Sequence, residues 1–181
     1  MPESRSYRVS TPDQLADIPE TDAAVAFIVD AYRTRLRRAG RGIEHPIEVA
    51  RLLAEDGQSA KVVVAGVLHD VLEDTNTATR ELEDVFGAGV ARLVTALSQD
   101  QSIKNYQERK EALRQQIIDA GRDAALVSLA DKTAKLRGVD SPPPKRKLHH
   151  YRETLRGIES RYGPSRMSRR LREQLERWPG P

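Results

Sequence analysis

The sequence predicts an all-α protein that folds as a single-domain helical bundle. Nearly every segment repeats its apolar residues with the period of a helix, and no segment sustains the alternation of a half-buried strand. The 181 residues are enough to enclose one hydrophobic core. Only 4% of them are aromatic, so this core must consist mainly of leucine, valine, isoleucine and alanine.

Three helices are expected in the first part of the chain. The first begins at residue 22, with Thr21 as its cap, and runs to about Arg38. Pro46 suits the first position of the second helix, where a missing N–H costs nothing. Ser59 is the candidate cap of the third helix. Residues 62–68 of that helix carry no polar side chain, so we expect it to be the buried centre of the bundle.

Short, locally connected helices are expected in the middle of the chain. One of them stops at Gly87, and the next carries an apolar stripe over residues 90–97. Asn105, with Glu108 three residues later, forms the pattern of a capping box for a longer helix that ends at Gly121.

The last part of the chain contains further helices and most of the positive charge. A helix starts at Asp123, the segment SPPPK at residues 141–145 interrupts the helical pattern, and two helices follow on either side of Gly163. Residues 141–181 contain 11 basic and 4 acidic residues, a net charge of +7, which leaves −4 for the rest. Such a tail could attract nucleic acid or a phosphorylated small molecule. We favour a solvated surface, because the aromatic residues and glycines of an RNA-binding sheet are missing.

Composition also excludes several classes of protein. The chain has no cysteine, which excludes disulfides, thiolate zinc sites and a cysteine nucleophile. The longest apolar stretch, residues 62–68, is far shorter than the ~20 residues of a membrane span, and the first ten residues contain no apolar core of a signal peptide. We therefore expect a soluble cytoplasmic protein that does not bind membranes.

The segment GVLHDVLEDT, residues 66–75, places titratable side chains directly after an apolar run. If it is one helix, His69 and Glu73 lie one turn apart, as do Asp70 and Asp74, so all four groups reach one small volume. Three carboxylates would repel each other there, and a divalent cation is the simplest compensation. The alternative is that the first two side chains bond inside the fold while the last two reach water.

Two other segments complete a recognisable order. His45 lies in IEHPIEVARLL and Asp131 in ALVSLADK; each alone is a weak signal. Together with His69 and Asp70 they give the order His, His-Asp, Asp, which is similar to the ligand pattern of the HD phosphohydrolase superfamily.

The similarity extends to the hydrolase domain of RelA/SpoT-type enzymes and especially to the small alarmone hydrolases. It rests on HPIEVARLL, GVLHDVLEDT, VFGAGVARLVTALS, ERKEALRQQI and LVSLADK in that order, and it covers roughly residues 22–178. We therefore expect residues 1–20 to be an N-terminal extension and residues 21–181 to be the HD domain. A synthetase domain, which long RelA/SpoT enzymes carry after the hydrolase, is not expected in a chain of this length.

The resemblance implies an HD-type helical bundle that removes the 3′-pyrophosphate of (p)ppGpp with manganese, leaving GDP or GTP and pyrophosphate. Carried over by position, the metal ligands would be His45, His69, Asp70 and Asp131, and the catalytic acids would be Glu73 and Asp74. Candidate substrate contacts are Arg37, Arg38, Arg109, Lys110, Lys132 and Lys135. Such a metal lowers the pKa of a bound water and neutralises phosphate charge, while a nearby carboxylate handles the proton.

Two departures from the family pattern concern the substrate. The segment before His45 lacks the family's His-x-Gly-Gln-x-Arg and Pro-Tyr-Ile, and only the pair Arg37-Arg38 resembles it. Lys135 stands where the family usually has asparagine, and it could contact a phosphate, compensate a carboxylate or repel the metal. We expect Lys135 to line the pocket, since it lies one turn after Asp131.

Three functions follow from these observations. We favour the manganese-dependent alarmone hydrolase. The second possibility keeps the chemistry but acts on another phosphorylated nucleotide, such as NADPH or one of a specialised pathway, because the base-binding segment departs from the pattern. The third is a non-catalytic sensor or nucleic-acid binder, against which Glu73 and Asp74 argue. We do not expect nucleic acid as a partner, whereas the amphipathic C-terminal helices allow a homodimer.

Overall fold

The computed structural model describes Leu15, residues 18–34 and residues 42–178. These residues form helices joined by turns, without a β-strand among them, so the all-α prediction is confirmed. The helices are α2 (Pro19–Thr34), α3 (Glu44–Glu55), α4 (Ala60–Leu68), α5 (Val71–Asp74), α6 (Thr79–Leu97), α7 (Tyr106–Ala120), α8 (Arg122–Leu136), α9 (Lys145–Tyr162) and α10 (Arg166–Glu176).

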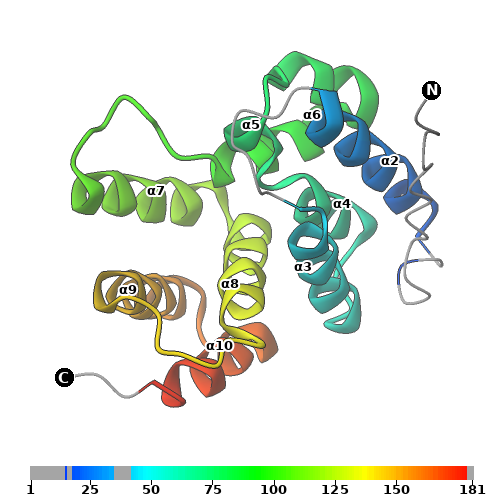
Figure 1. Ribbon diagram of the computed structural model, residues 1–181. Helices are drawn as coiled ribbons and strands as arrows, with labels where there is room; N and C mark the ends of the chain where they lie inside the picture. The colour runs from blue at the N-terminus through cyan, green and yellow to red at the C-terminus, as the bar shows by residue number, and fades with distance from the viewer. Residues whose placement is uncertain (1–14, 16–17, 35–41, 179–181) are drawn as a thin grey trace, which may run out of the picture.

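Helices α4 and α8 form the centre of the bundle. Helix α8 contacts α3, α4, α6, α7, α9 and α10, and Figure 1 shows it between α3 and α4 on one side and α7 and α9 on the other. Residues 62–68 of α4 are all buried, which confirms the prediction for that helix. Residues 124–134 of α8 are buried as well, although four of them are polar or charged. The sequence did not lead us to expect such burial of α8.

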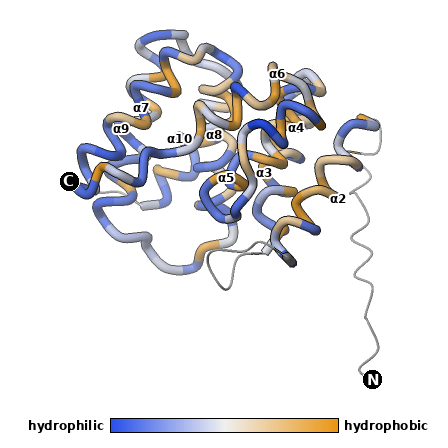
Figure 2. Tube along the Cα trace, turned by 90° about the horizontal axis from the view of Figure 1, so that it is seen from above, coloured by the Kyte–Doolittle hydropathy of each residue, from blue (hydrophilic) through white to orange (hydrophobic). Residues whose placement is uncertain are grey.

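The hydropathy of the chain follows this arrangement. In Figure 2 hydrophobic residues gather around α3, α4 and α8 in the middle of the molecule, whereas hydrophilic residues cover much of α9. Within the described part of the chain, no helix combines the length and the apolar character needed to cross a bilayer.

Several predicted helix ends are confirmed. The Asn105 carboxamide oxygen accepts from the backbone N–H groups of Gln107 (2.8 Å) and Glu108 (3.2 Å), so it caps α7. Gly87 has a φ of +82° and a ψ of 160°, which kinks α6 where the sequence predicted a stop. Gly163, with a φ of +75°, ends α9 one residue before Pro164.

The predicted cap at Thr21 is wrong. Helix α2 begins at Pro19, and the Thr21 hydroxyl lies within its first turn. This hydroxyl is buried and contacts the carbonyl oxygens of Leu15 at 3.0 Å and Ile18 at 2.6 Å. The threonine therefore stabilises the preceding turn of the chain. The predicted far end of this helix, near Arg38, lies outside the described residues.

The expectation of one continuous helix through residues 66–75 is also corrected. Helix α4 ends at Leu68, His69 and Asp70 form a turn, and the short helix α5 follows. The Thr75 hydroxyl donates to the Val71 carbonyl oxygen at 2.7 Å and closes the end of α5. Neither glycine nor proline occurs at the interruption, so no local sequence signal predicts it.

Gly66 fixes the distance between α3 and α4. A Cβ atom at this position would lie 2.6 Å from Leu53 Cδ1 and 3.5 Å from Ala50 Cα. Leu53 and Ala50 are fully buried, so neither can move aside without a rearrangement of the core. The two helices can therefore cross this closely only because Gly66 has no side chain.

We predict that Gly66→Ala lowers the free energy of unfolding by about 1–3 kcal/mol, since overpacking outweighs the gain in helix propensity. Gly89→Ala is the matched control, because the nearest atom to its added methyl would be Lys61 Cδ at 3.5 Å. The control should gain about 0.5–1 kcal/mol. Urea denaturation measures both, and equal stabilisation of the two variants would contradict the role of Gly66.

Candidate active site

Four side chains from three parts of the fold converge on one point. His45 comes from the first turn of α3, His69 and Asp70 from the turn after α4, and Asp131 from α8. One potential ligand atom of each lies within 4.8 Å of all the others. Asp131 Oδ1 is 2.9 Å from His45 Nε2 and 3.3 Å from His69 Nε2, and Asp70 Oδ2 is 3.2 Å from His69 Nε2. Ligand atoms of one small divalent cation lie about 3 Å apart, so the spacing fits a metal site.

The orientation of His69 supports this fit. Its Nδ1 lies 2.8 Å from the Gly66 carbonyl oxygen, which can only accept, so Nδ1 carries the hydrogen. The other nitrogen, Nε2, is buried and has no aligned hydrogen-bond partner, although two carboxylate oxygens lie near it. A backbone carbonyl that fixes the second ring nitrogen is the usual support of a metal-binding histidine.

The charges of the cluster are strongly coupled. Burial by itself disfavours ionised Asp131, but Lys135 and the two histidines outweigh burial and hold its pKa well below the usual range. The pKa of Asp70 is lowered in the same way by His69 and Lys135. Burial lowers the pKa of His69, yet Asp70 and Asp131 outweigh this effect and raise it to about 10. Both carboxylates are therefore ionised near neutral pH and attract positive charge.

Next to this cluster lies a cavity of about 260 Å³ between α5, α7, α8 and α9. Glu73 and Asp74 both line it, although they no longer belong to one helix with His69. Asp74 is 2% exposed, and Tyr32 Oη approaches its Oδ2 at 3.4 Å. The alternative in which Asp74 simply reaches water is therefore excluded.

Gln99 holds Glu73 in place, a role that no sequence pattern predicted. Its backbone N–H and its side-chain amide donate to the two carboxylate oxygens of Glu73 at 2.9 and 2.7 Å. The side-chain oxygen of Gln99, Oε1, accepts from Lys110 Nζ at 2.9 Å and from Arg109 Nε at 3.3 Å. A carboxylate in the cavity is thus linked through one amide to two basic side chains.

Four lysines also line the cavity. Lys110 comes from α7, Lys132 and Lys135 from α8, and Lys147 from α9. Burial lowers the pKa of Lys132 to about 8, and its Nζ donates to the Ser128 hydroxyl at 2.9 Å. A cavity lined by both carboxylates and ammonium groups suits a metal-bound phosphate.

Lys135 lines the cavity, as expected. Its Nζ lies 2.6 Å from Asp131 Oδ1 and 4.0 Å from Asp70 Oδ2. Burial lowers its pKa, but the two carboxylates outweigh burial and raise it above the usual value. Of the three roles left open by the sequence, the geometry supports compensation of a carboxylate.

His150 and Tyr151 of α9 also line the cavity and were missed. Burial, with Lys132 and Lys110 nearby, lowers the pKa of His150, so its ring is neutral at physiological pH. Arg114 Nη1 lies 3.3 Å from His150 Nδ1, which must therefore act as the acceptor. A helical-period count would have placed this histidine on the buried face of α9, but it would not have distinguished a pocket from the core.

One predicted substrate contact is not brought into the cavity. Arg109 does not line it; Nη1 of this residue donates to the carbonyl oxygens of Ile103 (2.5 Å) and Lys104 (3.3 Å), which anchors the loop before α7. Its contact with phosphate stays a prediction. Arg37 and Arg38 lie outside the described residues.

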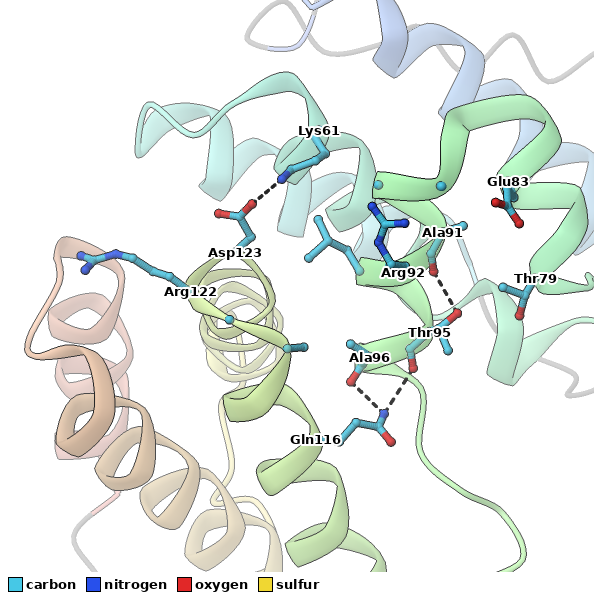
Figure 3. A pocket seen from close by; sticks show the side chains of 15 residues that line it. Lys61, Thr79, Glu83, Ala91, Arg92, Thr95, Ala96, Gln116, Arg122 and Asp123 are labelled. Atoms are coloured by element: carbon cyan, nitrogen blue, oxygen red, sulfur yellow. Dashed lines mark hydrogen bonds and ion pairs between the residues drawn. The ribbon is translucent and has the colours of Figure 1, made fainter.

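A larger groove of about 930 Å³ lies elsewhere, between α4, α6, α7 and the start of α8 (Figure 3). In this groove Lys61 is paired with Asp123 at 2.7 Å, and the Gln116 amide donates to the carbonyl oxygens of Thr95 and Ala96. None of the described residues that line it is a histidine or a predicted site residue. The larger volume of this groove does not make it the candidate site, because three of the candidate metal ligands line the smaller cavity.

Comparison with known proteins identifies the class. The family model described as "HD domain" matches residues 24–156, and the chain belongs to the HD domain family. It is similar to guanosine-3′,5′-bis(diphosphate) 3′-pyrophosphohydrolase MESH1 of Danio rerio, with 39% identity over 67% of this chain and 69% of the relative. MESH1 of Homo sapiens is 37% identical over 67% and 70%, respectively.

The chain also matches part of a longer enzyme. The bifunctional (p)ppGpp synthase/hydrolase SpoT of Escherichia coli K12 is 35% identical over 70% of this chain, which spans only 19% of SpoT. The structure described as "A metazoan ortholog of SpoT hydrolyzes ppGpp and plays a role in starvation responses" superposes with a TM-score of 0.70, at 23% identity, over 86% of this chain and 93% of that one. Protein lmo0812 of Listeria monocytogenes gives 0.62 at 25% identity, over 74% and 99%. The predicted HD-type helical fold is confirmed.

The raised pKa of His69 leads to a prediction for metal binding. Because this pKa is about 10, the ring carries a proton at neutral pH that a metal ion must displace. The affinity for Mn²⁺ should therefore rise about tenfold per pH unit between pH 6 and 8, with release of about one proton. Isothermal titration calorimetry in two buffers of different ionisation enthalpy measures both quantities. An affinity independent of pH would show that His69 is already neutral.

Proposed function

We propose that this protein is a metal-dependent hydrolase that removes the 3′-pyrophosphate of ppGpp and pppGpp, giving GDP or GTP and pyrophosphate. The curated relatives that it matches over about two thirds of their length carry the name of this activity. One observation carries the proposal. The cavity of about 260 Å³ joins three of the candidate metal ligands, His69, Asp70 and Asp131, to Glu73, Asp74 and four lysines.

The reaction breaks the bond between the ribose 3′ oxygen and phosphorus, and water supplies the new oxygen. A divalent cation held by His45, His69, Asp70 and Asp131 would supply an activated water and neutralise phosphate charge. The lysines of the cavity would bind the remaining phosphate oxygens with ammonium donors. Closely spaced positive groups are needed here because the pyrophosphoryl group that is transferred to water carries several negative charges.

Proton transfer in this scheme belongs to Glu73 and Asp74. Gln99 fixes both oxygens of Glu73 through N–H donors, which leaves lone pairs on the carboxylate to accept a proton from water. Asp74 is buried beside it, in contact with Tyr32. We assign to Glu73, the more exposed of the two, the role of accepting the proton of the attacking water, and to Asp74 the delivery of a proton to the ribose 3′ oxygen as it leaves.

A second candidate is the same chemistry on a different phosphorylated nucleotide, such as NADPH. It is supported by Lys135, which adds a positive charge to the cavity where the family usually has asparagine.

We further propose Mn²⁺ as the metal, since imidazole and carboxylate ligands suit it. We also propose that the HD domain comprises residues 21–181. A cytoplasmic location and a homodimer stay predictions.

Product analysis tests the proposed function. The purified protein with Mn²⁺ is mixed separately with ppGpp, NADPH and nucleoside mono-, di- and triphosphates, and ion-exchange chromatography identifies the products. We expect GDP and pyrophosphate from ppGpp, at a rate well above that of any other substrate. Asp70→Ala serves as the blank, because loss of this ligand should remove the metal and the activity together. If ppGpp stays intact while another nucleotide is hydrolysed, the second candidate function is favoured. If no substrate is turned over, the proposed enzymatic activity is refuted.

Gln99 should affect turnover without affecting the metal. We predict that Gln99→Met, which keeps the size but removes the amide, lowers kcat about tenfold with little change in KM, because Glu73 loses its orienting donors. Glu73→Gln should lower kcat by about 10²–10⁴. Both variants should bind Mn²⁺ as tightly as wild type. A Gln99→Met enzyme with normal kcat would show that Glu73 needs no such support.

A further inference from the structure

Lys135 occupies a position that competes with a metal ion for the same oxygen. Three basic nitrogens surround Asp131 Oδ1: His45 Nε2 at 2.9 Å, His69 Nε2 at 3.3 Å and Lys135 Nζ at 2.6 Å. The ammonium group is the nearest of the three. It also lies 4.0 Å from Asp70 Oδ2, so it contacts both carboxylates of the candidate metal site.

The chain supplies this counter-ion for an electrostatic reason. Asp131 lies on the most buried helix and Asp70 on the turn beside it, and ionised carboxylates in such a place are costly without a compensating charge. Lys135 is one turn after Asp131 on the same helix, so no further packing is needed to bring it there. A divalent cation would supply more positive charge to the same two carboxylates.

The two cations exclude each other on Asp131 Oδ1. A carboxylate oxygen has two lone-pair sites, and His45 Nε2 and Lys135 Nζ already lie at hydrogen-bond distance from this one. A divalent ion and an ammonium group on one oxygen would also repel each other in a site shielded from water. The Lys135 stem is flexible and 26% exposed, and the cavity beside it offers space for the ammonium group.

We propose that Lys135 is an internal counter-ion of the metal site, which neutralises Asp131 and Asp70 and which a divalent cation must displace when it binds. Lys135 thereby stabilises the protein without metal and weakens its affinity for metal. This inference rests on the metal site of the proposed function but on no nucleotide substrate. If Lys135 formed only a structural ion pair, it would stabilise the protein without metal but would not weaken the affinity for metal. If it only contacted phosphate, it would do neither.

The test is Mn²⁺ binding and thermal stability of Lys135→Met, whose side chain keeps most of the length and loses the charge. We expect its dissociation constant for Mn²⁺ to fall about tenfold or more, measured by isothermal titration calorimetry without nucleotide. Its melting temperature in EDTA should fall by about 5 °C or more, because two buried carboxylates lose their counter-ion. Excess Mn²⁺ should therefore raise the melting temperature of the variant more than that of the wild type.

Lys110→Met is the matched control. It removes the same charge from the same cavity, but Lys110 Nζ donates to Gln99 and not to a metal-site carboxylate. We expect less than about a threefold change in its Mn²⁺ dissociation constant, since the removed charge is not in contact with the ligands. Lys135→Gln is a second neutral variant and replaces Lys135→Met if the latter does not fold.

Two outcomes overturn the inference. The first is an unchanged or weaker Mn²⁺ affinity in the neutral Lys135 variants. The second is equal tightening in Lys110→Met, which would show a general charge effect of the cavity. Both measurements use Mn²⁺ alone, so absence of ppGpp hydrolysis would refute the proposed function while leaving this inference intact.

Discussion

The burial of one carboxylate, Asp131, determines how the site is built. An ionised group on the most buried helix of the bundle needs positive charge around it, and the fold provides this from three directions. His45 arrives from α3, His69 from the turn after α4, and Lys135 from the next turn of α8. Helix α3 packs against both α4 and α8, and this packing therefore holds the charged groups together.

The cavity brings groups of opposite charge together from several elements. Its carboxylates come from α5, α8 and the turn after α4, and its lysines come from α7, α8 and α9. Helix α8 supplies both signs, since Lys135 Nζ lies 2.6 Å from Asp131 Oδ1. Gln99 links the two kinds of group, because one end of its amide contacts Glu73 and the other Lys110. An amide suits this place, since it can donate and accept at once without adding charge.

Much of the fold was predictable, since apolar periodicity and the residues Asn105, Gly87 and Gly163 specify local structure directly. The four candidate metal ligands also came from sequence order, and the structure brings them together. Other features depend on tertiary contacts that no local pattern records. Packing between distant segments produces the break after Leu68, the burial of Lys132 and the hydrogen bonds from Gln99 to Glu73. Thr21 has the right chemistry for a cap, but a preceding turn competes for its hydroxyl.

Gly66 gives the site a property that neither the ligands nor the cavity reveals. Its missing side chain sets how closely α3 crosses α4, and its carbonyl oxygen orients His69, so one residue governs both the spacing and the angle of two imidazoles. Ions of different radius demand different ligand spacing. The spacing of the candidate ligands His45 and His69 therefore depends on the hydrophobic core, and a redesign of that core for thermostability would also change the size of the divalent ion that fits between them.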